Sequence, residues 1–328
     1  MDSQYLDLQF TTVQEQVPDF IYDDLKKYIN ESNSYHPQPH FLREILAKEH
    51  KVPADWVYLT NGVDEVIRIA IQAFGKNAHI FTPTEYSTFL QFCPSVKAHY
   101  SLVDDKYVLQ TDELADASLL WLANPNNPIG YTEPDTIFAL AQANKQSIVI
   151  VDEIYGEYAP QLSVIPAITS HPNLLVCKGF SKSYGLAGIR LGYIIGHPKQ
   201  LAKMSAFAPW ANVAYPSCGI AAIALEHKHY YQKLRDDIVV RKQKMVGWLT
   251  KQHFNVVPSF INTIVVKLAS RQRAMFIVDE LKKQNILINF GDNKDDMVGL
   301  PSNYISFVIG TDEQNNRLMT ALAKIPHH

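Results

Sequence analysis

The strongest constraint on the fold is an alternation of short apolar runs with amphipathic ones between about residues 60 and 200. The apolar runs have the length of strands and show no polar alternation: Ala78–Thr82, Ser118–Leu122, Ser147–Val151, Leu174–Cys177 and Tyr193–Ile195. Apolar residues at helical spacing mark Val63–Phe74 and Thr136–Ala143. Because strands that are apolar on both faces are typical of parallel sheets covered by helices, the pattern predicts an α/β fold with a mostly parallel sheet.

The chain changes character after about residue 225. A long charged helix is expected over Tyr230–Lys251, and strands over Thr263–Lys267 and Ile305–Ile309. This region reads as a smaller α+β domain, and 328 residues are enough for two domains. We therefore expect a large domain over 30–225 and a small domain that combines 1–29 with 226–328.

Composition excludes several classes of function. The net charge of -3 argues against a nucleic acid or an acidic membrane surface as partner. Cys93, Cys177 and Cys218 form neither a CxxC pair nor a metal-ligand spacing, so we expect free thiols in a reducing compartment and no metal site. No apolar run reaches membrane-spanning length, and the start lacks a secretory pattern. A cytoplasmic protein is the expectation.

Polar and aromatic groups follow the predicted strands, where open parallel sheets bind their ligands. They lie in five segments: Thr60–Asp64, Pro83–Ser87, Asn124–Gly130, Asp152–Tyr155 and Gly179–Arg190. A helix cap, a core aromatic ring or an ordinary turn would explain any one of them. Their succession at one strand end after another indicates a ligand site.

The chemistry of that ligand is suggested by Lys182. Its amine can form a Schiff base with an aldehyde, while the hydroxyl of Ser181 and the guanidinium of Arg190 can bind a phosphate. Asp152 directly follows a buried strand and needs a partner there, which a protonated heterocyclic nitrogen would provide. Tyr86 could lay its ring on a planar cofactor.

Three motifs together resemble one family. They are Asn-Pro-Asn-Asn-Pro-x-Gly at 124–130, Asp-Glu-x-Tyr at 152–155 and Phe-Ser-Lys-x-Tyr-Gly-Leu-Ala-Gly-x-Arg at 180–190. The chain resembles the class I and II pyridoxal-phosphate-dependent aminotransferases from about residue 30 to 200. Within that group it is most similar to histidinol-phosphate aminotransferases and threonine-phosphate decarboxylases. The resemblance implies fold type I, pyridoxal 5'-phosphate as cofactor, and small-molecule amino donors and keto acceptors as substrates.

The resemblance also implies a role for each matching residue. Lys182 would carry the cofactor as a Schiff base, Asp152 would pair with the pyridine nitrogen, and Tyr155 and Asn127 would bind the phenolic oxygen. Tyr86 would stack on the ring. The phosphate ligands would be Ser181, Arg190 and the backbone amides of Gly62, Val63 and Asp64. Tyr35 would reach the phosphate of the neighbouring subunit, which implies a homodimer with shared active sites.

The chain departs from the family pattern at three places. Gly179 stands where the family has a phosphate-binding Ser or Thr. Ser306 stands where it has an arginine that binds the substrate α-carboxylate as a bidentate clamp. Leu6–Thr11 replaces the Asn-Glu-Asn-Pro loop that covers the substrate. Either another arginine, Arg271 or Arg273, takes over, or the substrate differs.

The altered position leads to a specific expectation about substrate. With Ser306 in place of arginine, the amino compound either lacks a carboxylate there or has it bound differently, and Asn212 is a second candidate substrate contact. The predicted function is ping-pong transamination. Decarboxylation or elimination by the same fold is the alternative, and a cofactor-binding protein without turnover is a third possibility.

Overall fold

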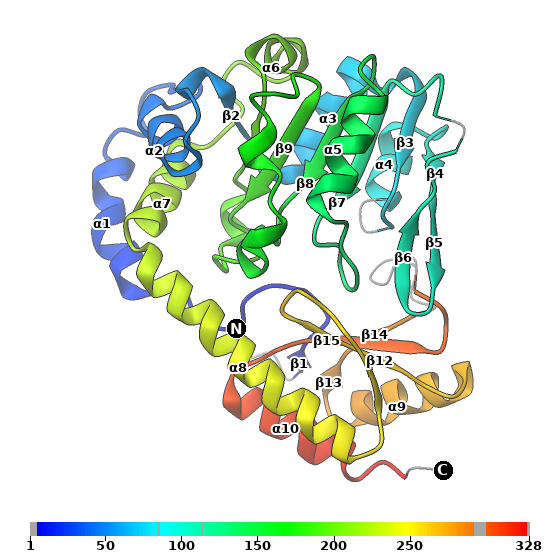
Figure 1. Ribbon diagram of the computed structural model, residues 1–328. Coiled ribbons are helices and arrows are strands. Elements are labelled where there is room, and N and C mark those ends of the chain that lie inside the picture. Colours follow the sequence, from blue (N-terminus) through cyan, green and yellow to red (C-terminus); the bar gives the residue numbers. More distant parts are fainter. Residues whose placement is uncertain (1–4, 84–85, 113, 292–299, 327–328) are drawn as a thin grey trace.

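The computed structural model describes residues 5–83, 86–112, 114–291 and 300–326. Figure 1 shows a larger α/β part above a smaller part, with the N-terminal end of the traced chain between them. A long helix, α8 (Lys228–Lys251), runs along one side from the larger part to the smaller.

The larger part is built on a seven-stranded sheet with the order β2-β10-β9-β8-β7-β3-β4. Its strands are β2 (Val57–Thr60), β3 (Ala78–Ile80), β4 (Lys97–Ala98), β7 (Leu119–Ala123), β8 (Ile148–Asp152), β9 (Leu174–Gly179) and β10 (Gly192–Ile195). Strand β10 is antiparallel to both of its neighbours, β2 and β9, and the other described pairings in this sheet are parallel. The prediction of an α/β fold with a mostly parallel sheet is confirmed.

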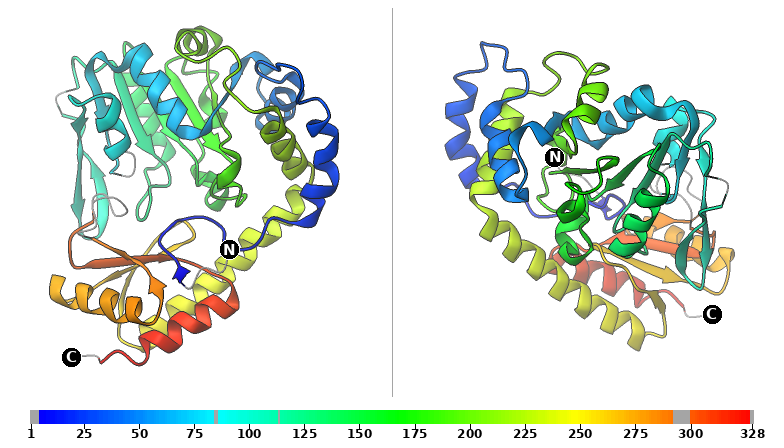
Figure 2. Two further views of the ribbon diagram at one scale, coloured as in Figure 1. Left: turned by 180° about the vertical axis from the view of Figure 1, so that it is seen from behind. Right: turned by 45° about the horizontal axis from the view of Figure 1, so that its top comes forward.

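Helices cover both faces of this sheet, as the views in Figure 2 show. One face packs on α3 (Gly62–Phe74), α4 (Tyr86–Phe92) and α6 (Pro198–Ser205). The other packs on α1 (Asp19–Ile29), α2 (His40–His50), α5 (Pro134–Ala143) and α7 (Tyr215–Glu226). Alternate residues of β7 serve the two cores, with Trp121 on the α3 side and Leu120 and Leu122 on the other. Short 3₁₀ turns lie at Ala54–Trp56, Gly75–Asn77, Gly156–Tyr158, Pro160–Leu162, Ile165–Ala167 and Ala187–Ile189.

The smaller part has an antiparallel sheet with the order β11-β12-β15-β14. Its strands are β11 (Asn255–Val257), β12 (Thr263–Lys267), β15 (Tyr304–Val308) and β14 (Asn289–Phe290). One face packs on α8, α9 (Arg271–Lys283) and α10 (Asp312–Leu322). The opposite face turns toward the larger part, because Val265 and Tyr304 cluster there with Tyr107 and Ile129.

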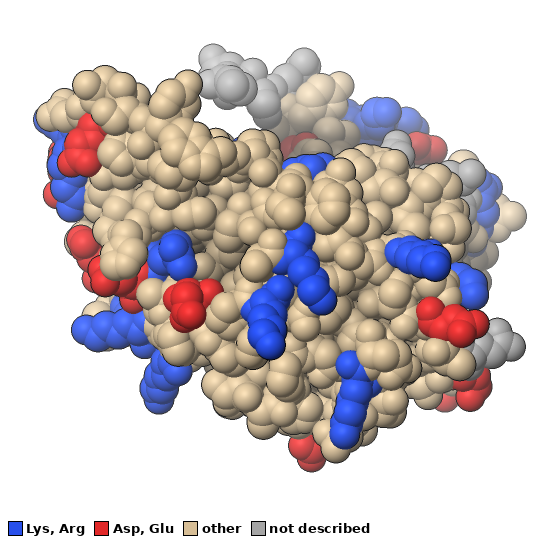
Figure 3. All heavy atoms as spheres, turned by 90° about the horizontal axis from the view of Figure 1, so that it is seen from above, with Lys and Arg blue, Asp and Glu red and all other residues tan. Residues whose placement is uncertain are grey.

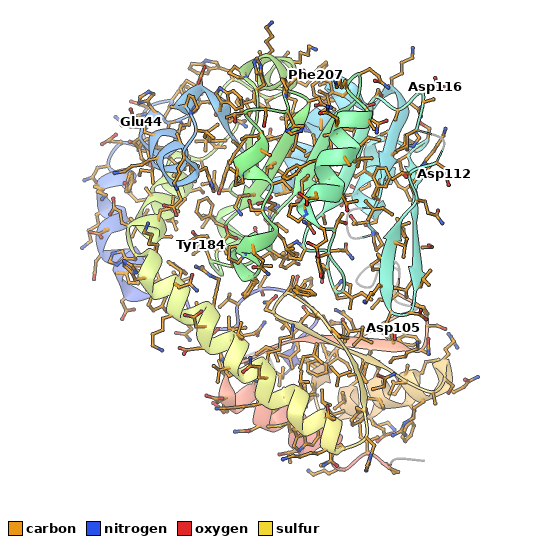
Figure 4. The ribbon with its side chains drawn as sticks, viewed as in Figure 1. Glu44, Asp105, Asp112, Asp116, Tyr184 and Phe207 are labelled. Atoms are coloured by element: carbon orange, nitrogen blue, oxygen red, sulfur yellow. The ribbon has the colours of Figure 1, made fainter. Side chains whose placement is uncertain are left out.

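A hairpin of β5 (Tyr100–Val103) and β6 (Lys106–Leu109) also joins the two parts. At its tip, Asp105 accepts hydrogen bonds from Tyr304 and from Lys267, the latter at 3.0 Å. Figure 4 shows Asp105 pointing to the smaller part. The same figure labels Tyr184, whose ring centroid lies 5.0 Å from that of Tyr231 in α8.

The N-terminal residues divide between the two parts, unlike the predicted grouping of 1–29 with the small domain. Strand β1 (Leu6–Asp7) pairs in parallel with β13 (Ile286–Leu287) of the smaller part. Helix α1, in contrast, buries Ile21 in the large-domain core beside α7. The amphipathic pattern of α1 predicts one apolar face but does not say which surface it covers.

The charge distribution of the surface and the state of the cysteines can be compared with the expectations from composition. Figure 3 shows Lys and Arg scattered over one face of the molecule, with Asp and Glu among them. The three cysteines are free and buried. Among the described residues, no helix is both long and apolar enough to cross a membrane.

Candidate active site

A cavity of about 540 Å³ lies at the carboxyl ends of the parallel strands. The N-terminus of α3 and the segments after β7, β8 and β9 contribute to its wall. The structure brings together eight of the predicted site residues here: Val63, Asp64, Asn127, Asp152, Tyr155, Ser181, Lys182 and Arg190. A cavity of similar size, about 560 Å³, lies along α8 and contains none of them.

The asparagine-rich loop after β7 holds its own shape. Asn124 donates from Nδ2 to the carbonyl of Thr132 at 3.0 Å and accepts from the Thr132 N–H at 2.9 Å. Asn126 donates from Nδ2 to the carbonyl of Ile129 at 2.9 Å. Since these two side chains are occupied inside the loop, Asn127 is the asparagine that lines the cavity.

Asp152 is the last residue of β8, and only 1% of its surface is exposed. Burial raises the pKa of its carboxyl to about 7, although the N–H of Ile154, which donates to Oδ1 at 2.9 Å, and the side chain of Cys177 both act to lower it. A buried carboxylate of this kind gains most from a cationic N–H partner. This is the environment that a pyridinium nitrogen requires.

A buried group of charges supports the loop that carries the lysine. Lys178 Nζ lies 3.0 Å from Oε1 of Glu157 and 3.7 Å from Oε2 of Glu153. Ser183 donates to Oε2 of Glu157 at 2.6 Å. Ser183 follows Lys182 directly, so this group fixes the backbone next to the reactive amine. The sequence motif contains Ser183, but no local pattern indicated its partner.

The amine of Lys182 donates a hydrogen bond to Oγ1 of Thr11 at 3.0 Å. The same hydroxyl lies 2.5 Å from Oη of Tyr155, which is 2% exposed. Thr11 was not predicted as a site residue. It lies 171 positions before Lys182, at the end of the segment Leu6–Thr11 that stands in place of the substrate-covering loop, and its contact with the lysine is visible only in the folded structure.

The corner of the cavity at α3 is built for an anion. Gly62 opens the helix with φ +70°, and a Cβ on this glycine would lie 2.9 Å from Nη2 of Arg190. The guanidinium therefore rests against the helix N-terminus, where free N–H groups and the helix dipole favour negative charge. Its Nη2 also lies 2.7 Å from Oδ2 of Asp64.

Tyr35 and Asn212 are not among the described residues that line this cavity. Tyr35 is 80% exposed, and its ring centroid lies 5.7 Å from that of Trp210. Asn212 accepts from Gln38 at 2.9 Å and donates to Glu65 at 2.7 Å, so it braces the start of α3. Tyr86 begins α4, but its side chain is not among the described ones.

Ser306 is 1% exposed in β15 and is paired with Val265. It shares the face that turns toward the larger part. The two arginines considered as replacements lie elsewhere. Arg273 donates to the carbonyl of Pro326, and Arg271 lies over the ring of Phe290, which packs with the core on the helical face.

Two kinds of comparison identify the family. The chain matches the family described as aminotransferase class I and II over residues 2–322, and it therefore belongs to that family. The histidinol-phosphate aminotransferase of Chromohalobacter salexigens is 31% identical over 326 residues, which cover 95% of this chain and 88% of that protein. The histidinol-phosphate aminotransferase of Marinomonas sp. is 31% identical over 307 residues, covering 90% and 85%.

Solved structures share the fold. The histidinol-phosphate aminotransferase from Sinorhizobium meliloti, in complex with pyridoxal-5'-phosphate, has a TM-score of 0.86 at 22% identity and covers 97% of this chain and 89% of its own. An L-threonine-O-3-phosphate decarboxylase from Porphyromonas gingivalis has a TM-score of 0.80 at 22% identity, with 97% and 98% covered. The chain is thus a pyridoxal-phosphate-dependent aminotransferase of fold type I, and the predicted family, fold class, enzyme class and cofactor are confirmed.

Proposed function

We propose that the enzyme carries out ping-pong transamination between a small amino donor and a keto acceptor, in the cavity that holds Lys182. One observation carries this proposal. The amine of Lys182, the buried carboxyl of Asp152 and the anion-binding corner of Arg190 line a single cavity. Those are the three groups that a phosphorylated pyridine aldehyde needs.

The chain's residues fit the cofactor as follows. Ser181, Arg190 and the N-terminal amides of α3, from Gly62 to Asp64, would hold the phosphate. Asp152 would hold the proton on the pyridine nitrogen. Asn127 and Tyr155 would bind the phenolic oxygen. The stacking of Tyr86 on the ring stays a prediction, because that side chain lies outside the described residues.

Bound pyridoxal phosphate supplies an electron sink for the bond broken at the substrate Cα. The protein's part is proton transfer and orientation. Asp152 would keep the ring nitrogen protonated, because a carboxylate buried in this way is stabilised by pairing with a cationic N–H. When it is not attached to the cofactor, the Nζ of Lys182 would accept the proton from the substrate Cα and hold it for return later in the transfer.

We propose further that two subunits share their active sites. Tyr35 is far too exposed for a core residue, and Trp210 beside it is 69% exposed. An aromatic pair of this kind on a surface is typical of a protein interface. The side chain of Tyr35 would then complete the phosphate site of the neighbouring subunit.

The substrate is proposed to carry no anion where the family binds a carboxylate. Ser306 offers a neutral hydroxyl in place of a charged fork. Among the described residues lining the cavity, only Lys182 and Arg190 are cationic, and bound pyridoxal phosphate would engage both. Asn212 as a second substrate contact remains a prediction, since its amide is engaged by Gln38 and Glu65 in one subunit.

The assignment of Lys182 has a direct test. The purified protein, loaded with pyridoxal phosphate, is reduced with borohydride, digested and analysed by mass spectrometry. We expect one pyridoxyl tag, on the peptide that contains Lys182, and no tag on that peptide in Lys182→Ala. A tag on another lysine, or none, would overturn the proposed function.

The neutral substrate site is tested with a panel of donors that includes common α-amino acids, amines without a carboxylate, and histidinol phosphate, the compound in the relatives' names. We expect the wild type to favour the amines without a carboxylate and Ser306→Arg to gain activity toward α-amino acids. A melting curve shows whether the buried arginine still permits folding. Wild-type turnover of common α-amino acids with a KM in the ordinary range, about 1 μM–1 mM, would by itself contradict the neutral site.

Decarboxylation or elimination is the alternative reaction for this fold, and the Porphyromonas gingivalis structure shows that a decarboxylase can share it. A single experiment separates the two reactions. When only the donor is added, transamination accumulates the aminated cofactor. Decarboxylation instead releases carbon dioxide and leaves the cofactor spectrum as it began.

A further inference from the structure

Thr11 lies between the two residues on which the chemistry depends. Its Oγ1 accepts a hydrogen bond from Lys182 Nζ at 3.0 Å and lies 2.5 Å from Oη of Tyr155. The side chain is 8% exposed and belongs to no helix or strand. A hydroxyl has one hydrogen to donate and two lone pairs to accept with, so it can serve both neighbours at once.

The segment that carries Thr11, Leu8–Val13, is called the strap here. The small domain holds its backbone. The N–H of Leu8 donates to the carbonyl of Leu287 at 3.0 Å, and its carbonyl accepts from Val308 at 2.9 Å. Asn289 donates from Nδ2 to the carbonyl of Gln9 at 2.8 Å. These bonds attach the start of the strap to β13, β14 and β15 of the smaller part.

A second asparagine holds the strap on the other side of Thr11. Asn262, 1% exposed, donates from Nδ2 to the carbonyl of Thr12 at 3.3 Å. Beyond it, the side chain of Val13 packs against Gly185, where a Cβ would come within 2.9 Å. Gly185 has φ +65°, and its N–H donates to the carbonyl of Lys182 at 3.3 Å. The strap thus spans from the small-domain sheet to the lysine loop.

We propose that Thr11 is a positioning residue for the catalytic lysine. Its hydroxyl holds the free amine of Lys182 beside Tyr155 during the interval in which the donor, and not the lysine, is attached to the cofactor. A long lysine side chain loses much conformational freedom when it is held in this way. An acceptor at a fixed place keeps Nζ within reach of the substrate Cα. Thr11 itself forms and breaks no covalent bond, and the inference rests on the proposed role of Lys182.

Two substitutions separate positioning from packing. Thr11→Val keeps the shape of the side chain and removes the acceptor, while Thr11→Ser keeps the hydroxyl and removes a methyl group. We expect Thr11→Val to slow the donor half-reaction about tenfold at saturation, the equivalent of one hydrogen bond, with the donor KM nearly unchanged. Thr11→Ser should stay within about threefold of the wild type on the same reasoning.

A second readout does not depend on turnover. In the cofactor-free protein, reductive methylation of Lys182 is followed against pH by mass spectrometry, which gives the apparent pKa of its amine. An acceptor stabilises the charged ammonium, so its loss in Thr11→Val should lower that pKa. Thr11→Ser should leave it near the wild-type value. A change in packing alone would not reproduce this pair of results.

The proposal is overturned if Thr11→Val keeps both the wild-type rate and the wild-type lysine pKa, or if Thr11→Ser is as slow as Thr11→Val. The borohydride tag on Lys182 is measured in the same variants. If every variant carries the tag and the rate of the donor half-reaction is unchanged, only the role of Thr11 is rejected and the assignment of Lys182 stands. Absence of the tag from the wild type rejects the assignment of Lys182.

A double-mutant cycle tests whether the strap acts through Thr11. Asn262→Ala removes the bond to the carbonyl of Thr12, so we expect it to slow the half-reaction in the presence of Thr11. In the Thr11→Val background the same change should have little further effect. If the two effects multiply in full, the strap does not work through this hydroxyl and that part of the proposal is wrong.

Discussion

At the scale of single residues, the site combines groups whose environments differ sharply. Asp152 is buried at a strand end with neutral donors around it, whereas Arg190 is half exposed and paired with Asp64. Burial therefore disfavours the charged form of the carboxyl until a cationic partner stabilises it, and the guanidinium lies near the place of the phosphate. This division matches a cofactor with a cationic ring nitrogen at one end and an anionic group at the other.

Asp152→Asn should stabilise the cofactor-free protein at high pH. The pKa of this carboxyl is raised to about 7 by burial, above the ordinary value of about 3.9. Between these values the folded chain keeps a proton that the unfolded chain has released, so wild-type stability falls as pH rises from about 4 to about 7. About three pKa units at about 1.4 kcal/mol each set the upper limit, so we expect the variant to gain up to about 4 kcal/mol in the free energy of unfolding at pH 8, and little near pH 4.

Urea unfolding of the wild type and of Asp152→Asn at pH 4 and pH 8 measures this difference in the free energy of unfolding. Added pyridoxal phosphate should stabilise the wild type much more than the variant, because the variant cannot pair with the ring nitrogen as a carboxylate. An equal difference between the proteins at both pH values would show that ionisation of Asp152 is not its cause.

At the scale of helices and strands, close approaches of backbone position the site. Gly192 of β10 packs on the start of α3, since a Cβ there would lie 2.9 Å from the carbonyl carbon of Gly62. Gly219 of α7 likewise allows a close approach to α1, because a Cβ on this glycine would lie 2.2 Å from Cγ of Tyr28. The α1 and α7 contact depends on that space.

Gly219→Ala should destabilise the protein by about 1–3 kcal/mol through overpacking against Tyr28. Gly247 provides a matched control, because it also lies inside a helix but a Cβ there meets nothing within 4 Å. Gly247→Ala should stabilise by about 0.5–1 kcal/mol, from helix propensity alone. Chemical denaturation gives the free energy of unfolding of both variants and so tests the two expectations. Equal effects of the two changes would mean that the α1 and α7 contact tolerates a methyl group.

The elements also show how far the sequence predicts this structure. Strand β12 has the predicted bounds, and β8 differs by one residue at each end, because buried strands leave unbroken apolar runs. The direction of β10 was not predictable, since an apolar run has no polarity. The spacing within the motif at 180–190 predicted that Ser181, Lys182 and Arg190 would lie together, and all three line one cavity. Thr11 was missed because its contact depends on chain geometry over 171 positions, and a lone threonine forms no pattern.

At the scale of the whole molecule, the proposed shared site makes a test by subunit mixing possible. Tyr35→Phe should weaken cofactor binding about tenfold through the loss of one hydrogen bond to a charged group. Lys182→Ala subunits are inactive on their own. In a mixed dimer, the Tyr35→Phe subunit supplies Lys182 and its partner supplies Tyr35, so one site is complete.

Co-expression with two affinity tags isolates the mixed dimer, and its cofactor affinity and activity are compared with those of each parent. One site of wild-type affinity is expected. A mixed dimer that binds the cofactor no better than Tyr35→Phe alone, or a protein that stays monomeric at assay concentration, would contradict the shared site.

Helix α8 spans the molecule as one rod of 24 residues, with Tyr231 in the core above and Met245 and Leu249 in the core below. The helix therefore ties the two cores together. Because the smaller part holds the backbone next to Thr11 while Lys182 belongs to the larger part, the contact between Oγ1 and Nζ depends on how these two parts sit against each other.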